Sequence, residues 1–189
     1  MTAPFCILSI AGSDSGGGAG IQADQRTIRA LGGHALTAVT AVTAQDTRGI
    51  QAWEAVSPRI LEAQILSALA GFRVAAAKTG LLPGAGAVRA AAAALSRSRG
   101  LPLVVDPVLA STSGTRFLTD QGIRELKKRL FPLASLITPN WPEAELLTGL
   151  RVQSHAEAEL AALALARECG RPVLVKGGHA RRGLCRDCL

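Results

Sequence analysis

The chain of 189 residues contains no tyrosine, and aromatic residues make up only 3% of it. Its hydrophobic residues, 48% of the chain, therefore have to build a core largely from leucine, valine, isoleucine and alanine. This apolar content is too high for a disordered chain. The length suits one domain with a sizeable core, so we expect a single domain over residues 1–189.

Long apolar runs are missing as well. No uninterrupted apolar stretch in the sequence reaches the length that crosses a bilayer. The first 14 residues lack a positively charged start, and their apolar segment is too short for a signal peptide. These two absences predict a cytoplasmic protein with no membrane partner.

Cysteine is scarce, with four residues in the chain. We expect Cys6 and Cys169 to be reduced thiols, while Cys185 and Cys188 form a C-x-x-C pair near the C-terminus. A zinc or redox site would need a second pair of ligands or a supporting fold, and only His179 lies nearby. We therefore expect no metal or redox chemistry at this pair.

Acidic residues are outnumbered by basic ones, 14 against 21, which gives a net charge of +7. The basic residues cluster at 127–129 and 181–182, but few aromatic residues accompany them and no nucleic-acid-binding motif is present. A solvated helix face and a basic tail explain these clusters better than a nucleic-acid partner does.

Strand-like and helix-like segments alternate along the whole chain. The expected strands cover 5–11, 35–44, 74–78, 101–106, 135–140 and 172–178. The expected helices cover 21–31, 57–69, 85–95, 120–130, 142–149 and 154–168. Ser57 before Pro58 and the S-H-A-E of 154–157 are typical helix starts. This alternation predicts an α/β fold with a mostly parallel sheet covered on both faces.

A glycine-rich loop, residues 11–20, follows the first expected strand and holds five glycines. Glycine costs conformational entropy on folding, so such a loop indicates a close approach of a ligand or a turn with positive φ. A P-loop is excluded because no lysine lies in or near the segment. The G-x-G-x-x-A of residues 18–23 fits a loose dinucleotide fingerprint, but Asp24 comes too early and Asp46 rather late for the acidic partner, which disfavours a reductase.

Polar residues follow the carboxyl end of each expected strand, where parallel sheets bind their ligands. After the glycine loop they are Thr43, Gln45, Lys78, Thr79, Asp106, Asn140, Glu143 and Lys176. We expect them to converge on one rim. Simpler roles stay open for several: Asp24 and Glu143 can be first-turn acids of helices, Gln45 and Asn140 turn residues, and Lys176 a solvated strand end.

Six segments together resemble the hydroxymethylpyrimidine/phosphomethylpyrimidine kinases of thiamine biosynthesis, which belong to the ribokinase-like superfamily. They are AGSDSGGGAGIQAD (11–24), TAVTAQDTRG (40–49), AKTGLL (77–82), VVDPVLASTSG (104–114), LITPNWPEAELL (136–147) and VLVKGGH (173–179). The resemblance covers residues 5 to about 180. The first segment and AQDTRG are typical of this family and of its pyridoxal-kinase-like relatives, whereas the N-x-x-E of 140–143 is typical of the wider superfamily.

The resemblance implies a three-layer α/β/α sandwich that uses ATP and Mg²⁺ to phosphorylate 4-amino-5-hydroxymethyl-2-methylpyrimidine and then its monophosphate. Family members are commonly dimers, so a homodimer is expected. The implied pyrimidine-binding residues are Gly12, Ala19, Asp24, Thr43, Gln45, Leu81 and Val108. Thr43 and Leu81 stand where the family pattern has a valine and a methionine. The implied ATP-binding residues are Asp106, Asn140, Glu143 and Lys176, of which Asn140 and Glu143 would position Mg²⁺.

One segment of the family pattern is not found. The family carries a later GTGC-type motif at a helix N-terminus, which supplies an anion hole and a cysteine base. No G-T-G or G-x-G-[DC] occurs after residue 150 here, so we assign no catalytic residue and expect a C-terminally incomplete domain whose activity is in doubt. Two alternatives stay open: a pyridoxal or pyridoxine kinase-like enzyme, and a non-catalytic pyrimidine-binding module.

Overall fold

The computed structural model describes residues 5–110, 116–178 and 185–189. A six-stranded sheet with the order β3-β2-β1-β4-β5-β6 forms the middle of the molecule. Its strands are β1 (Cys6–Asp14), β2 (His34–Asp46), β3 (Gly49–Ala55), β4 (Val74–Thr79), β5 (Leu103–Val105) and β6 (Leu136–Ile137). All neighbouring pairs are parallel except β2 and β3, which confirms the predicted mostly parallel sheet.

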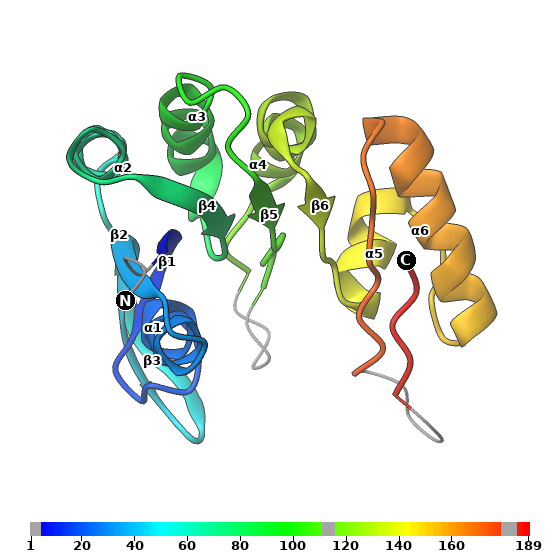
Figure 1. Ribbon diagram of the computed structural model, residues 1–189. Coiled ribbons are helices and arrows are strands. Elements are labelled where there is room, and N and C mark those ends of the chain that lie inside the picture. Colours follow the sequence, from blue (N-terminus) through cyan, green and yellow to red (C-terminus); the bar gives the residue numbers. More distant parts are fainter. Residues whose placement is uncertain (1–4, 111–115, 179–184) are drawn as a thin grey trace.

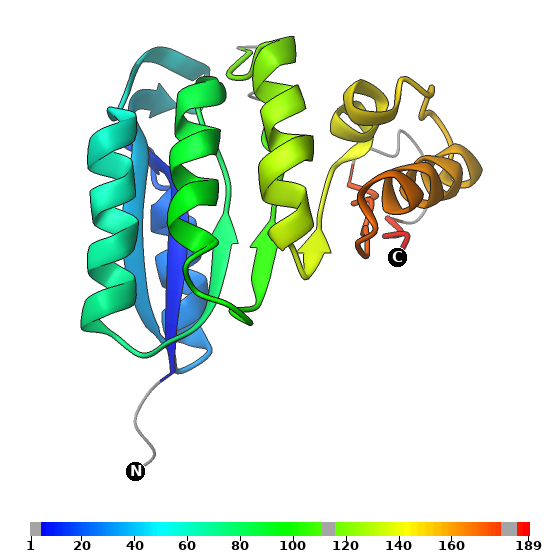
Figure 2. The same ribbon diagram turned by 90° about the horizontal axis from the view of Figure 1, so that it is seen from above.

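Helices cover the two faces of this sheet. They are α1 (Gly20–Ala30), α2 (Pro58–Gly71), α3 (Gly84–Leu95), α4 (Asp120–Glu125), α5 (Trp141–Thr148) and α6 (His155–Cys169). Figure 1 shows α2, α3 and α4 on one face and α1 on the other, and Figure 2 shows the same three helices side by side. Helices α5 and α6 pack together beyond β6. The arrangement is the three-layer sandwich expected from the sequence.

The helix starts show why these segments fold where they do. The Ser57 hydroxyl accepts the Ile60 N–H at the start of α2, as predicted. The Ser154 hydroxyl accepts the Glu157 N–H at the start of α6, but the Glu157 carboxylate accepts the N–H of Gln153, so the predicted capping box closes one residue early.

Three segments differ from the sequence prediction. Strand β3 was missed: it pairs antiparallel with β2, and most of its side chains are exposed, so it lacks the apolar run of a buried strand. The helix expected over 120–130 changes to a π-helical turn at Leu126–Leu130. The segment expected as a strand over 172–178 makes only isolated bridges: parallel ones from Val173 to Ile137 and from Lys176 to Asn140, and an antiparallel one from Val175 to Cys188.

The core fills the space between the sheet and its helices with aliphatic side chains. Leu8 and Ile10 of β1 and Leu61 and Ile65 of α2 are fully buried. Burial of one such side chain contributes about 1.5–3 kcal/mol to the free energy of unfolding. None of the helices in the described part of the chain is long and apolar enough to cross a membrane.

Candidate active site at the carboxyl ends of the strands

A cavity of about 410 Å³ lies at the carboxyl ends of the parallel strands. All eleven residues that the resemblance implies as ligand-binding line it: Gly12, Ala19, Asp24, Thr43, Gln45, Leu81, Asp106, Val108, Asn140, Glu143 and Lys176. They come from segments far apart in the sequence, and the parallel sheet brings them together because its strands end at one edge. Where each would contact a ligand stays a prediction.

The glycine loop is organised by Asp14, a buried residue that sequence reasoning missed. The Asp14 carboxylate accepts the N–H of Gly16 and the N–H of Ala19, both at 2.8 Å. The first bond is an Asx turn, and the D-S-G sequence was the signal that could have revealed it. Two backbone N–H groups thus satisfy this carboxylate, and further hydrogen bonds tie the loop to Gln22 and to the Gln45 backbone.

Gly20 of this loop has no room for a side chain, and Gly12 has little. Gly20 has a φ of +57°, and a Cβ there would lie 2.2 Å from the carbonyl oxygen of Gly12. A Cβ at Gly12 would lie 3.0 Å from Cδ2 of Leu81. The loop backbone therefore lies directly against the first strand and the β4 end of the cavity.

Strand β2 contributes two of the predicted residues to the same half of the cavity. The buried Thr43 hydroxyl donates to the carbonyl oxygen of Ser13 at 3.0 Å, so this hydroxyl is bound within the protein. Gln45 is held by its backbone, because the Ser15 hydroxyl accepts its N–H and donates to its carbonyl oxygen. The Gln45 side chain lines the cavity.

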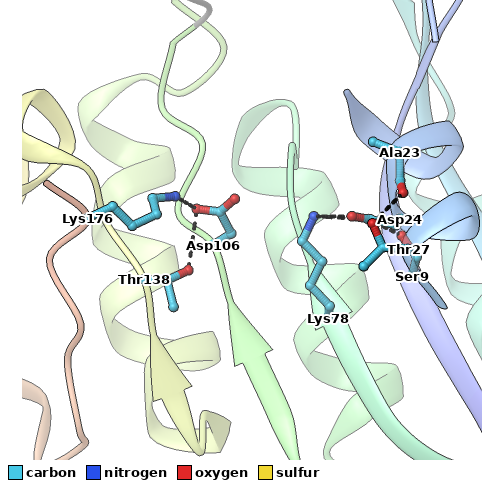
Figure 3. Close-up of polar contacts among 8 residues, drawn as sticks. All are labelled: Ser9, Ala23, Asp24, Thr27, Lys78, Asp106, Thr138 and Lys176. Atoms are coloured by element: carbon cyan, nitrogen blue, oxygen red, sulfur yellow. Dashed lines mark hydrogen bonds and ion pairs between the residues drawn. The ribbon is translucent and has the colours of Figure 1, made fainter. Parts of the chain in front are cut away.

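Asp24 lies in an ion pair that crosses from helix α1 to the sheet. Lys78 Nζ lies 2.8 Å from Oδ1 and 2.9 Å from Oδ2 of Asp24, and the buried Ser9 hydroxyl donates to Oδ2 at 2.6 Å. Figure 3 shows Lys78 extending from β4 toward Asp24. Asp24 lies beyond the first turn of α1, so the simpler role of a first-turn acid is wrong, and its carboxylate serves this ion pair instead.

A second ion pair lies at the other half of the cavity. Lys176 Nζ donates to Oδ1 of Asp106 at 2.5 Å, and the Thr138 hydroxyl lies 3.5 Å from the same oxygen (Figure 3). Beside it, Asn140 and Glu143 form a capping box at the start of α5. Asn140 Oδ1 accepts the Glu143 N–H at 2.9 Å, and Glu143 Oε2 accepts the Asn140 N–H at 2.8 Å.

Glu143 combines this helix-cap role, which confirms the simpler prediction for it, with a place in the cavity wall. Burial raises the pKa of the Glu143 carboxyl to about 7. The Asn140 N–H and the Lys176 ammonium group act against this rise in pKa, whereas the Asp106 carboxylate adds to it. A carboxyl group in a cavity whose pKa is shifted in this way is a candidate functional group.

The donor set can be compared with the needs of a metal ion. No cluster of three or more histidine, cysteine or acidic side chains suited to a metal occurs within residues 5–110, 116–178 and 185–189. Asp106 and Glu143 offer carboxylate oxygens on one wall, which fits Mg²⁺ bound partly through water. His179 of the C-terminal C-x-x-C region and Ser111–Gly114 of the fourth resemblance segment lie outside the described residues.

Comparisons with known proteins show the family of this chain. The family model described as phosphomethylpyrimidine kinase matches residues 14–189. The hydroxymethylpyrimidine/phosphomethylpyrimidine kinase of Mycobacterium leprae is 46% identical over 181 residues, which are 95% of this chain and 65% of that protein. This chain thus spans just under two thirds of the length of that relative.

Solved structures share the fold. A phosphomethylpyrimidine kinase from Clostridium difficile superimposes with a TM-score of 0.85 at 37% identity, over 97% of this chain and 79% of that one. The ADP complex of a Bacillus subtilis pyridoxal kinase gives a TM-score of 0.86 at 29% identity, over 98% and 70%. The family model matches nearly the whole length of this chain, and a relative is 46% identical to it. This chain therefore belongs to the phosphomethylpyrimidine kinase family.

Proposed function

We propose that this chain binds 4-amino-5-hydroxymethyl-2-methylpyrimidine and its monophosphate, and that it directs the terminal phosphoryl group of ATP to them. One observation carries the proposal: the eleven residues implied by the resemblance line a single cavity. One half of that cavity is formed by glycine-loop backbone, and the other half by paired charges. A flat ring beside a polyphosphate suits this division.

The acceptor half comprises Gly12, Ala19, Asp24, Thr43, Gln45, Leu81 and Val108. A pyrimidine ring can approach the loop backbone closely because Gly12 has no side chain. The Gln45 amide both donates and accepts hydrogen bonds, so it matches the amino group and ring nitrogen of the pyrimidine. The Thr43 hydroxyl is bound to Ser13, which makes Thr43 a substitute for the valine of the family pattern.

The phosphate half comprises Asp106, Asn140, Glu143 and Lys176. Lys176 is the cation that would contact the phosphates of ATP, with Asp106 holding its ammonium group at 2.5 Å. Asn140 and Glu143, joined by the capping box, would position Mg²⁺ partly through water, with the Asp106 carboxylate on the same wall. Mg²⁺, when bound, neutralises charge on the transferred phosphoryl group. The protein residues position the two substrates, which is the main requirement of phosphoryl transfer.

A thermal melt of the purified chain with and without the hydroxymethylpyrimidine tests the proposal. Ligand at a hundred times its Kd should raise the free energy of unfolding by about 2.7 kcal/mol. A cooperative melt that the pyrimidine leaves unchanged would overturn the substrate assignment. ADP formation is measured separately, because the sequence has no G-T-G or G-x-G-[DC] after residue 150. Pyrimidine binding without ADP formation would favour the non-catalytic binding module.

A pyridoxal or pyridoxine kinase-like function is the second candidate, favoured by the likeness to the Bacillus subtilis pyridoxal kinase. The two candidates differ in the ring that the acceptor half must accept. We expect the hydroxymethylpyrimidine to raise the melting temperature more than pyridoxal does at equal concentration. The reverse order would assign the chain to the pyridoxal-specific relatives.

A further inference from the structure

Lys78 has no role among the residues assigned to the site, yet it lines the cavity and carries one of the two ammonium groups that the described lining residues supply. The other ammonium group belongs to Lys176, which is held by Asp106 at the phosphate half. The lining also holds the carboxyl groups of Asp14, Asp24, Asp106 and Glu143. Acidic side chains therefore outnumber lysines among these lining residues. A phosphorylated ligand is an anion, so it depends on the lysines for binding.

The position of Lys78 is fixed by its neighbours. Ser9 of β1 and Lys78 of β4 are direct partners across the parallel pair, so both side chains leave the sheet on the same face. Helix α1 covers that face and supplies Asp24 to both of them, at 2.6 Å from the Ser9 hydroxyl and 2.8 Å from the Lys78 ammonium group. Three elements therefore hold this ammonium group in one place (Figure 3).

Part of the ammonium group stays available to a ligand. A lysine has three N–H donors, and both contacts of Lys78 go to the one carboxylate of Asp24. The neighbouring Gly80 also lines the cavity, and a Cβ there would lie 3.5 Å from Nζ of Lys78. The absence of a side chain at Gly80 leaves the ammonium group open toward the cavity, and the side chain of Lys78 is 30% exposed.

The order of the strands places Lys78 in the middle of the rim. Strand β4 lies between β1, which leads into the glycine loop, and β5, which leads to Asp106. In the proposed function the acceptor ring lies toward β1 and β2, and the ATP phosphates lie toward β5 and β6. The group that joins the two sites, a hydroxymethyl or a phosphomethyl group, therefore lies beside the end of β4.

We propose that Lys78 binds the phosphate of the phosphorylated acceptor, so that it selects for a phosphate monoester over a neutral alcohol. The inference rests on the proposed function, since that function supplies both acceptors. The Asp24 carboxylate orients the ammonium group, and one N–H donates to a phosphate oxygen in a charge-assisted hydrogen bond. The neutral hydroxymethylpyrimidine lacks this partner and gains little from Lys78.

Calorimetric titration of the full 189-residue chain tests this without a need for turnover. The probes are the hydroxymethylpyrimidine, its monophosphate and ADP. The quantity compared is the ratio of the Kd for the monophosphate to the Kd for the alcohol. We expect Lys78→Met to raise this ratio about tenfold or more, because a charge-assisted bond is lost for one ligand only. Lys78→Arg keeps the charge and should change the ratio by less than about threefold.

Three controls separate the alternatives. Asp24→Asn keeps the ammonium group and an oxygen that can orient it, and it removes a negative charge that repels the phosphate, so the ratio should stay level or fall. The double variant Asp24→Asn/Lys78→Met leaves no unpaired charge, and its ratio should rise as in Lys78→Met even where the single variant fails to fold. Lys127→Met removes a lysine paired with Glu168 outside the cavity and should leave the ratio unchanged.

Other outcomes would overturn the inference. An equal loss of both acceptors in Lys78→Met would show that Lys78 acts only by holding Asp24. Weaker ADP binding of the same size would assign Lys78 to the phosphates of the nucleotide instead. A ratio that rises in Asp24→Asn as much as in Lys78→Met would also contradict it. If the unsubstituted chain binds neither acceptor, the proposed function itself fails.

Discussion

The two halves of the cavity are built in opposite ways. In the acceptor half, contacts within residues 12–24 shape the glycine loop: the Asp14 carboxylate holds the N–H groups of Gly16 and Ala19, and Gly20 packs against Gly12. Hydrogen bonds of Ser13 and Ser15 then join this loop to strand β2. The phosphate half joins side chains of three separate segments, with Asp106 and Glu143 beside Lys176, the one cation that the described residues place there. The acceptor half therefore has a loop shape that is fixed by hydrogen bonds before any ligand binds, whereas the phosphate half brings together carboxyl groups that suit an added cation.

The largest expected effect is a loss of the preformed acceptor half. Gly20→Ala should lower the free energy of unfolding by about 3 kcal/mol or more, because it adds left-handed strain to a contact of 2.2 Å with a backbone oxygen. Urea unfolding measures the change. Gly84→Ala is the matched control: its φ is +74°, but nothing lies within 4 Å of the added Cβ, so it should cost only about 1 kcal/mol. Equal losses would show that the close approach at Gly20 contributes nothing.

The sequence predicted this half well because its information is local. Five glycines after an apolar run indicated a close backbone approach, and the loop geometry agrees. Asp14 was missed since one carboxylate among glycines looks like any turn residue until its two N–H partners are known. Strand β3 was missed for a related reason: its exposed side chains carry no apolar run, and only pairing with β2 defines it.

The second prediction concerns the excess of carboxyl groups in the phosphate half. The pKa of Glu143 is about 7 in the folded chain against 4.5 for a free glutamate, so between these values the folded state binds more protons than the unfolded chain. The free energy of unfolding should therefore fall as the pH rises from 5 to 8, by at most about 3 kcal/mol. Urea unfolding at the two pH values measures this fall.

Glu143→Gln should remove most of that pH dependence. Glutamine also completes a capping box, so α5 keeps its start while the buried charge is gone. At pH 8 the variant should be at least as stable as the unsubstituted chain, yet it should bind Mg²⁺ and ADP more weakly. Glu125→Gln is the control. The hydrogen bond to Arg129 lowers the pKa of the Glu125 carboxyl, so this carboxyl does not change its charge between pH 5 and 8. A Glu143→Gln variant with an unchanged slope would contradict the assignment.

Sequence reasoning reached the residues of the phosphate half but not their contacts. Asp106, Asn140 and Lys176 stand at the expected strand ends, and the parallel sheet brings them together. No local pattern could show that Lys176 pairs with Asp106, 70 positions away, or that Lys78 pairs with Asp24 rather than facing solvent. Pairings of this range depend on strand order, which the sequence pattern does not specify.

A smaller effect should follow from Asp14→Ala. Loss of the carboxylate frees two backbone N–H groups of the glycine loop, which should lower the free energy of unfolding by about 2 kcal/mol. Pyrimidine binding should weaken about tenfold, since the loop loses its fixed shape. Asp46→Ala is the matched control, because Asp46 makes the same turn contact to the Arg48 N–H at an exposed hairpin. If both variants lose the same stability, the acceptor half is not specially preformed.

The smallest expected effect is that of Thr43→Val, which restores the valine of the family pattern. The Thr43 hydroxyl donates to Ser13 at 3.0 Å, so its loss should lower the free energy of unfolding by about 1 kcal/mol. The Kd for the hydroxymethylpyrimidine should change by less than about threefold, because the hydroxyl serves the loop and not the ligand. Calorimetric titration decides between the two roles. A Kd raised tenfold with unchanged stability would mean that the hydroxyl turns to the substrate, and the acceptor half would then be completed by its ligand rather than preformed.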